Sequence, residues 1–217
     1  MADIRRDVLQ ESVAKLSNQG LKVISFVADI TKSSDAQAIV KETMLRFGQV
    51  NVLVNSAGIR VESHPDGYKE EHRIIPQSLL WETEESDWDL IINTNLKSVF
   101  LCSRAVIPHM LKSDGGGSII NITSGFGRKG GSGRSAYASS KHAVEGLTKS
   151  LAIELEPHKI GVNSLYPDGR VNVDGRGGHD PFTMVPPALF LATKDAAISG
   201  RSICANRWKE ELSAFIG

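Results

Sequence analysis

The stretch Val50-Asn-Val-Leu-Val54 is a compact apolar run in a sequence of otherwise mixed character. Such a run predicts a strand buried on both faces, as in parallel sheets that are covered by helices. Apolar residues recur at helical spacing before it, over 36–47, and a helix is predicted after it, over 87–111, where Ser86 can cap its start. We therefore expect a strand between two helices at this point.

The same alternation extends in both directions along the chain. Further strands are predicted at 22–28, 118–122, 160–165 and 202–205, and further helices at 4–19, 135–156 and 187–193. Strands separated by helices of this length form right-handed crossovers, which build a parallel sheet with helices on both faces. With no internal repeat and no linker, the sequence predicts one α/β domain over residues 1–217.

Composition excludes several classes of protein. The 217 residues carry 25 Lys and Arg against 25 Asp and Glu, and this zero net charge argues against a nucleic-acid-binding protein. Cys102 and Cys204 predict free thiols rather than a disulfide framework. No apolar run reaches the roughly 20 residues of a membrane helix, and no signal peptide precedes the domain. We expect a cytoplasmic protein that contacts no membrane.

The loop 59–85 has no clear period, and it is rich in acids and histidines. Because their spacing matches no known metal site, we expect a solvated loop over the substrate cleft and no metal. The residues concerned are Glu62, His64, Asp66, Glu70, Glu71 and His72.

The segment Tyr137-Ala-Ser-Ser-Lys141 carries the strongest chemical signal. Residues four apart share a helix face, so the Lys141 ammonium is expected to lower the pKa of the Tyr137 phenol toward neutrality. Ser124, at the end of the predicted strand 118–122, could reach the same substrate oxygen. These groups suit proton transfer at a carbonyl or alcohol carbon. Taken alone, Tyr-x-x-x-Lys also fits an ordinary surface pair.

An ordered set of motifs surrounds this segment and resembles the short-chain dehydrogenase/reductase family over about residues 3–205. The set consists of Val52-Leu-Val-Asn-Ser-Ala-Gly58, Asn93-Thr-Asn-Leu96, Gly117-Ser-Ile-Ile-Asn-Ile-Thr-Ser124, Tyr137 to Lys141, and Ile160-Gly-Val-Asn-Ser-Leu-Tyr-Pro167. The resemblance implies a Rossmann-like three-layer fold and a site whose catalytic residues are Asn95, Ser124, Tyr137 and Lys141. The resemblance implies that Tyr137 is the acid/base and that Lys141 lowers the pKa of Tyr137 and holds the nicotinamide ribose. It implies further that Ser124 orients the substrate and that the Asn95 backbone supports a water-linked proton relay.

The resemblance also implies a dinucleotide cofactor. Its predicted contacts are Asp3, Asp29, Asn55, Ala57, Gly58, Tyr137, Lys141 and Pro167. An acid at Asp3 would accept from the ribose 2′-hydroxyl and repel a 2′-phosphate, which favours NAD(H) over NADP(H). A solvated N-terminal charge is the alternative for Asp3.

The family's first strand and glycine-rich turn have no counterpart here, so we expect an N-terminally truncated fold or a protein that starts upstream of Met1. In a chain that folds alone, strand 22–28 is expected to shift toward strand 50–54 and fill the gap. Gly125-Phe-Gly-Arg-Lys-Gly130 matches G-x-G-x-x-G, but four residues separate it from the helix at Ser135, so we reject it as a replacement.

Two departures affect the substrate side. Asp168 separates Pro167 from Gly169, which the family keeps adjacent, and a Gly/Arg/Asp-rich loop over 170–181 stands where the family has a longer helical lid. The leading prediction is an NAD(P)-dependent oxidoreductase that interconverts a secondary alcohol and a ketone. The alternative is a non-catalytic member that acts as a binding or assembly subunit. The resemblance further implies a homodimer or homotetramer formed through helices 87–111 and 135–156.

Overall fold

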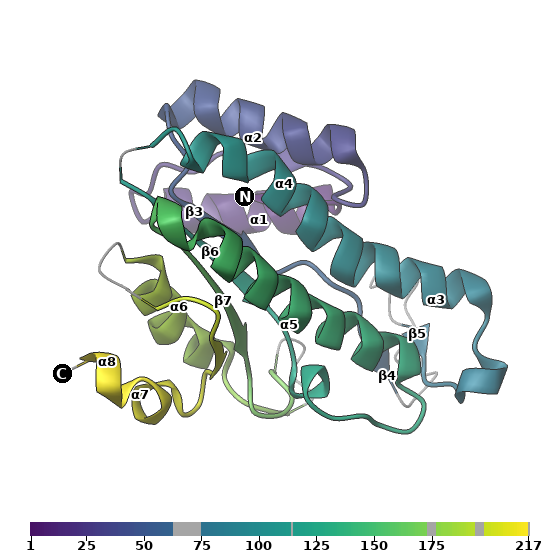
Figure 1. Cartoon of the computed structure of the whole chain (residues 1–217). Coiled ribbons are helices and arrows are strands. Elements are labelled where there is room, and N and C mark those ends of the chain that lie inside the picture. The colour runs from purple at the N-terminus through teal and green to yellow at the C-terminus, as the bar shows by residue number, and fades with distance from the viewer. Residues whose placement is uncertain (63–74, 114, 173–176, 194–197, 217) are drawn as a thin grey trace.

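The computed structural model describes residues 1–62, 75–113, 115–172, 177–193 and 198–216 (Figure 1). At its centre lies a four-stranded parallel sheet in the order β3-β6-β7-β8. These strands are β3 (Val52–Asn55), β6 (Gly117–Ile122), β7 (Ile160–Tyr166) and β8 (Ser202–Cys204). The predicted parallel sheet is confirmed.

Helices cover both faces of this sheet. Neighbouring residues of β6 point to opposite sides, so they pack against different helices. Ile119 packs in a core with residues of α2 (Ser33–Phe47), α4 (Ser98–Met110) and α5 (Ser135–Leu155). Ile120 packs instead with Leu191 of α6 (Val185–Ala192), and Ser118 Oγ donates a hydrogen bond of 2.7 Å to the Leu191 carbonyl. The structure therefore confirms the three-layer, Rossmann-like α/β fold.

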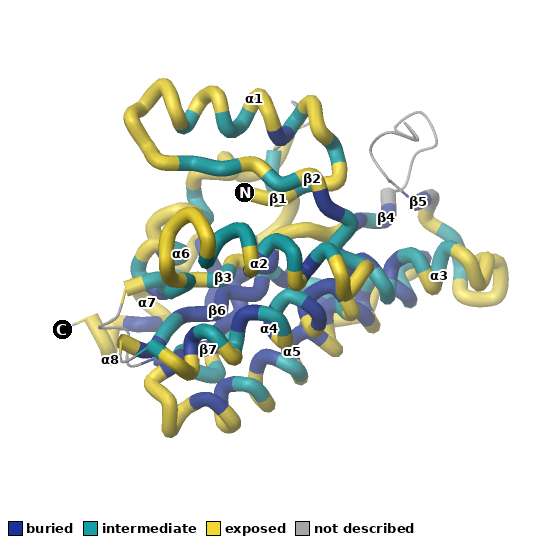
Figure 2. The backbone as a smooth tube through the Cα atoms, turned by 90° about the horizontal axis from the view of Figure 1, so that it is seen from above, coloured by how far each residue is buried: buried dark blue, intermediate teal, exposed yellow. Residues whose placement is uncertain are grey.

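The N-terminal segment forms a separate small sheet. β1 (Ala2–Asp3) and β2 (Phe26–Val27) pair in parallel, and α1 (Arg6–Ser17) packs on them. Figure 2 shows this unit beside the rest of the chain, and neither of its strands bonds to β3. The predicted shift of strand 22–28 toward strand 50–54 is therefore wrong, because the backbone NH groups of Phe26 and Ala28 are bound by the carbonyls of Met1 and Asp3.

The predicted burial of β3 on both faces is also wrong. Val52 and Val54 are 37% and 48% exposed, whereas Asn55, on the opposite face, is buried. Helix α4 packs on β3, and in the described part of the chain β6 is the strand that bonds to it. β3 is therefore an edge strand with one uncovered face.

The predicted helix 87–111 is interrupted by a wider turn. It consists of α3 (Glu85–Ile92), a π-helical turn (Asn93–Lys97) and α4. By length and composition alone, the 26-residue run Glu85–Met110 could cross a membrane. However, α4 packs against α2, β3 and β6, and α3 packs against α5, so the run is a core helix of this fold.

The remaining elements are short. The loop 59–85 contains β4 (Val61–Glu62), parallel to β5 (Ile75–Pro76), and a 3₁₀ turn (Leu80–Glu82). The five acids and histidines of this loop other than Glu62, between residues 64 and 72, lie outside the described residues. The chain ends with α7 (Trp208–Glu211) and α8 (Ser213–Ile216), which the sequence did not predict.

Candidate active site

Ser124 lies directly beyond the carboxyl end of β6, where the chain leaves the sheet. Its backbone is extended, with φ of −156°, and its hydroxyl accepts a hydrogen bond from Phe126 N at the start of a 3₁₀ turn over 125–127. The chain then continues as a loop until α5 begins at Ser135. The rejected motif Gly125–Gly130 therefore opens a tight turn and not a helix, as predicted.

Tyr137 and Lys141 lie on the first two turns of α5, which faces the same strand end. The Lys141 Nζ lies 5.8 Å from the centre of the Tyr137 ring and donates a hydrogen bond of 3.1 Å to the Ile122 carbonyl. The Ser124 hydroxyl hydrogen-bonds to the Tyr137 phenol. The structure thus brings together three of the four predicted catalytic side chains. His142, the residue after Lys141, is exposed, and its Nδ1 hydrogen-bonds with the Ala138 carbonyl rather than with this cluster.

The electrostatics of this cluster differ from the sequence-based expectation. Burial raises the pKa of Tyr137 above its ordinary value, whereas the hydrogen bond with Ser124 and the charges of Arg134 and Arg60 lower it. Burial also lowers the pKa of Lys141 to about 8, an effect that the charge of Glu145 opposes. In the structure, the charges that lower the phenol pKa are therefore the two arginines, which the sequence analysis did not single out. Arg134 also donates a hydrogen bond to the Val61 carbonyl.

Asn95 lies within the π-helical turn and is fully buried. Its Oδ1 accepts from Ile59 N at 2.7 Å, and its Nδ2 donates to the Ile59 carbonyl at 2.9 Å and to Ser140 Oγ at 3.2 Å. The side chain thereby fixes the segment after β3 against α5. Turns of this wide type are frequent at functional sites.

Gly58 brings that segment close to the cluster. A Cβ added to Gly58 would lie 3.1 Å from Asn95 Oδ1 and 3.7 Å from Lys141 Nζ. Its backbone therefore borders the buried ammonium with no side chain between them. Ala57 precedes it on the same exposed segment.

Asn55 ends β3, but its side chain points into the core. Its Nδ2 donates to Asn121 Oδ1 at 2.8 Å, and Asn121 Nδ2 in turn donates to Thr148 Oγ1 at 2.9 Å. This buried chain links β3, β6 and α5. The side chain of Asn55 therefore has a structural role.

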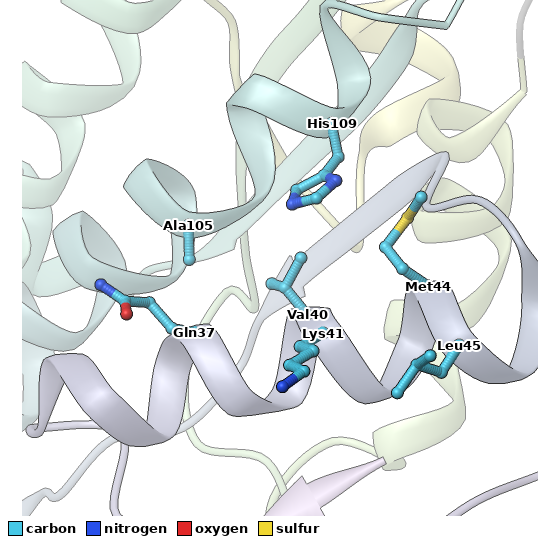
Figure 3. A pocket seen from close by; sticks show the side chains of 7 residues that line it. All are labelled: Gln37, Val40, Lys41, Met44, Leu45, Ala105 and His109. Atoms are coloured by element: carbon cyan, nitrogen blue, oxygen red, sulfur yellow. The ribbon is translucent and has the colours of Figure 1, made fainter.

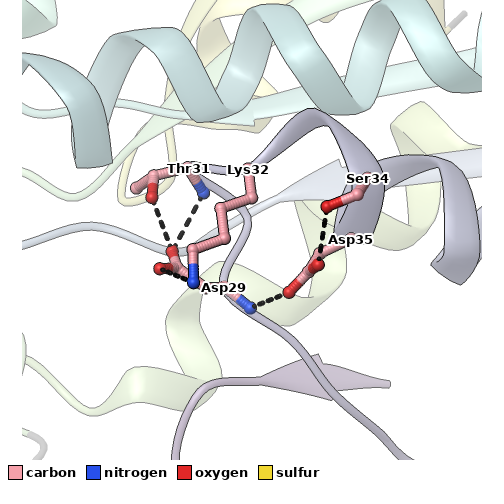
Figure 4. Close-up of polar contacts among 5 residues, drawn as sticks. All are labelled: Asp29, Thr31, Lys32, Ser34 and Asp35. Atoms are coloured by element: carbon pink, nitrogen blue, oxygen red, sulfur yellow. Dashed lines mark hydrogen bonds and ion pairs between the residues drawn. The ribbon is translucent and has the colours of Figure 1, made fainter.

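The two predicted adenosine contacts lie at the ends of the small sheet. The Asp3 carboxylate accepts from Arg5 N at 2.8 Å at the carboxyl end of β1. The Asp29 carboxylate accepts from the backbone NH and hydroxyl of Thr31 and lies 3.6 Å from Lys32 Nζ, as Figure 4 shows. Asp29 N donates to Asp35 Oδ2 at 2.9 Å. Asp29 therefore also stabilises the turn that leads into α2.

The departure after β7 is visible in the structure. Pro167 is half-buried, whereas Asp168 is exposed and its backbone NH donates to Asn206 Oδ1 at 3.0 Å. Gly169 follows with φ of +105°, a value that side-chain-bearing residues rarely adopt. Residues 173–176 of the predicted lid segment lie outside the described residues.

A groove of about 380 Å³ lies elsewhere, between α2 and α4 (Figure 3). It is lined by Gln37, Val40, Lys41, Met44, Leu45, Ala105 and His109. None of these residues belongs to the cluster around Tyr137, so the groove is not the candidate active site. Within the described ranges, no three His, Cys, Asp or Glu side chains gather as metal ligands do.

Most predicted site residues share one location, the carboxyl edge of parallel strands. Gly58 follows β3, Ser124 follows β6 and Pro167 follows β7, while Asp3 and Asp29 end or follow the strands of the small sheet. Ligands of open α/β sheets bind at this edge. The fold and the cluster together define an α/β protein with a serine, tyrosine and lysine site at the strand ends.

Comparison with known proteins gives the same class. The sequence profile of the family "short chain dehydrogenase" matches residues 1–176. A 3-oxoacyl-[acyl-carrier-protein] reductase FabG of Staphylococcus epidermidis is 35% identical over 162 residues, which are 75% of this chain and 60% of that protein. The (2S)-[(R)-hydroxy(phenyl)methyl]succinyl-CoA dehydrogenase subunit BbsD of Thauera aromatica is 36% identical over 165 residues, 76% of this chain and 60% of that protein. This chain belongs to the short chain dehydrogenase family.

Solved structures agree with the fold. A short chain dehydrogenase from Mycobacterium smegmatis superposes with a TM-score of 0.80 at 25% identity, covering 94% of this chain and 78% of the other. A putative short-chain alcohol dehydrogenase from Sinorhizobium meliloti 1021 also gives a TM-score of 0.80, at 24% identity, with 94% and 82% covered. The chain spans about 60% of the length of the curated relatives it matches.

Proposed function

We propose that this chain is an NAD(P)-dependent oxidoreductase that interconverts a secondary alcohol and a ketone. The observation that carries the proposal is the cluster at the end of β6, where the Ser124 hydroxyl bonds to the Tyr137 phenol beside a buried ammonium. The names of the relatives support the substrate class, since they describe a reductase of a 3-oxoacyl group and a dehydrogenase of a hydroxyl compound.

In this proposal, the proton moves through Tyr137. During oxidation, the phenolate takes the proton of the substrate hydroxyl, and during reduction the phenol returns a proton to the carbonyl oxygen. Ser124 hydrogen-bonds to the same oxygen and orients it. The positive charges of Arg60 and Arg134 favour the phenolate, which counteracts the raised pKa that burial imposes.

The residues present fit the nicotinamide-ribose end of a dinucleotide. The backbone of Gly58 closely approaches Lys141, since a Cβ at position 58 would lie 3.7 Å from Lys141 Nζ, and the Lys141 ammonium and the Tyr137 phenol are donors on the same helix. A bound nicotinamide supplies the acceptor or donor of the hydride. Pro167, Ala57 and the Asn55 backbone lie at the same edge, whereas Asp3 and Asp29 would hold the adenosine end. Because Asp3 carries a carboxylate there, we propose a preference for NAD(H) over NADP(H).

Assembly through α4 and α5 is also proposed. Phe100 on α4 is 45% exposed and Ile153 on α5 is 74% exposed, and large apolar side chains at a surface favour a protein partner. A second copy of the chain, as a homodimer or homotetramer, would cover them. A cytoplasmic location stays a prediction.

The test begins with nucleotide binding. Titration of the purified chain with NADH and with NADPH, followed by nicotinamide fluorescence, should give micromolar binding of NADH and weaker binding of NADPH. Turnover of secondary alcohols is then compared between the wild type, Tyr137→Phe and the control Tyr166→Phe, which alters another buried tyrosine. Loss of turnover in Tyr137→Phe alone supports the proposal, and unchanged turnover refutes it.

A non-catalytic binding or assembly subunit is the second candidate. It is favoured by the separation of β1 and β2 from the main sheet and by the exposed Asp168 between Pro167 and Gly169. A folded chain that binds neither nucleotide would support this candidate over the enzyme.

A further inference from the structure

Glu145 is a buried acid on α5 that neither the motifs nor the proposed proton transfer involves. It is 6% exposed and lies one helical turn beyond Lys141. Its carboxylate accepts hydrogen bonds from three hydroxyls: Thr123 at 2.7 Å, Ser164 at 2.7 Å and Ser202 at 3.0 Å.

These donors come from three adjacent parallel strands. Thr123 directly follows β6, Ser164 lies in β7 and Ser202 begins β8. One side chain therefore attaches α5 to the carboxyl half of the sheet. Because Ser124 is the next residue after Thr123, the same bond fixes where the Ser124 hydroxyl lies relative to Tyr137.

A buried carboxylate is costly unless its environment compensates for it. Other buried positions of α5 are apolar, as at Val144, or carry an uncharged hydroxyl, as at Thr148, so helix packing by itself does not require an acid here. Three hydroxyl donors satisfy the carboxylate, which can only accept hydrogen bonds. The remaining charge acts on the nearby buried ammonium, and among the acids of the described residues Glu145 is the one whose charge raises the pKa of Lys141.

We propose that Glu145 is a positioning residue of this site, which keeps Lys141 in its ammonium form and, through Thr123, holds Ser124 against Tyr137. The proposal rests on the proposed function for its catalytic part, while its electrostatic part concerns the chain alone. Among the described residues, the other groups near the cluster are Arg60 and Arg134, which act on Tyr137, and Asn95 and the Ile122 carbonyl, near Lys141. Arg128 lies on the β8 side, where it donates to the Ser202 carbonyl.

The electrostatic part is tested without cofactor or substrate. The Cε resonance of Lys141, in protein labelled with ¹³C-lysine and assigned by its loss in Lys141→Met, is followed against pH. In Glu145→Gln the midpoint should fall by about one pH unit, as expected for removal of a charge one turn away at intermediate dielectric. Glu145→Asp keeps the charge on a shorter side chain, farther from Lys141, so it should restore only part of the shift. The control Glu154→Gln, at an exposed position of the same helix, should leave the midpoint unchanged.

The positional part is tested by Thr123→Val, which removes the hydroxyl but keeps the shape. Alcohol turnover should show a kcat at least tenfold lower at an unchanged dissociation constant for NADH.

An unchanged Lys141 midpoint in folded Glu145→Gln overturns the electrostatic part, and an unchanged kcat in Thr123→Val overturns the positional part. If Glu145→Gln does not fold, the Lys141 midpoint in Glu145→Asp decides. A midpoint lower than in the wild type supports the inference, and an identical midpoint overturns it. If the wild type turns over no alcohol, the proposed function fails, while the midpoints still decide the role of Glu145.

Discussion

The Lys141 ammonium donates a hydrogen bond to the carbonyl of Ile122, the last residue of β6. This bond joins the predicted proton-transfer helix to the strand that presents Ser124. It also places a positive charge in a buried environment, and this charge has a cost that can be measured as a function of pH.

Replacement of Lys141 by Met should therefore stabilise the chain at neutral pH. Burial lowers the pKa of Lys141 from 10.5 to about 8, so between these values the unfolded chain binds more protons than the folded one. Stability consequently rises with pH across this window, and below it the buried charge costs about 3 kcal/mol at about 1.36 kcal/mol per pKa unit. Urea unfolding should show a stability gain for Lys141→Met at pH 7 that shrinks by pH 10. The same gain at both pH values would contradict this account, and Lys149→Met serves as an exposed control.

Removal of the Asn95 amide should destabilise the fold. The amide satisfies both the backbone NH and the carbonyl of Ile59, a residue that is only 6% exposed. Because each buried polar group left without a partner costs about 1–3 kcal/mol, we expect Asn95→Ala to lose about 2–5 kcal/mol of unfolding free energy. Lys97→Ala, at an exposed position of the same turn, should lose little. Equal losses in both variants would refute the role assigned to Asn95.

Two glycines with similar backbone angles should respond differently to alanine. Gly20 and Gly116 have φ of +78° and +67°, but a Cβ at Gly20 meets open space, whereas one at Gly116 would collide with the backbone carbonyl of Lys159. Gly20→Ala should cost about 1–2 kcal/mol from the left-handed conformation alone. Gly116→Ala should cost several times more, because the carbonyl that it displaces belongs to the segment leading into β7. Chemical denaturation of both variants checks the ratio, and similar losses would count against it.

The uncovered face of β3 predicts self-association of the chain. Val52 and Val54 lie on one face of an edge strand, and exposed apolar edge strands promote pairing between chains. Val54→Lys should reduce concentration-dependent association in analytical ultracentrifugation. Ile153→Lys tests the helical interface separately, because it alters the exposed side of α5. Association that persists in Val54→Lys but disappears in Ile153→Lys would locate the contact on the helices.

Local patterns predicted most of this fold. Strands β6, β7 and β8 and helices α2 and α5 lie within a few residues of their expected bounds, because each alternates apolar residues at the period of its own structure. The chemical signal at Tyr137 and Lys141 was visible for the same reason, as residues four apart share a helix face. The exposure of Val52 and Val54 on β3 could not be predicted from the local sequence, because the burial of these side chains depends on whether distant segments cover them.

Other features of the site have no local signature. The π-helical turn at Asn95 adds one residue to a turn within a run that remains apolar and helical. Glu145 resembles any acid on an amphipathic helix, and its burial follows only from the placement of Thr123, Ser164 and Ser202 on three strands. The Arg60 and Arg134 charges near Tyr137 arise from two loops that meet only in the folded chain.

The detached sheet of β1 and β2 has a consequence for cooperativity. Within residues 1–28 only Leu9 and Ala28 are buried, and no strand hydrogen bond connects this unit to β3. A segment with so few interior contacts opens at a lower free energy than the core around Ile119 and Val162. In amide hydrogen exchange, residues 1–28 should therefore behave as a separate foldon that loses protection first. Of the two predicted adenosine contacts, Asp3 lies within this segment and Asp29 borders it. Nucleotide binding at these carboxylates would therefore order the least stable part of the molecule.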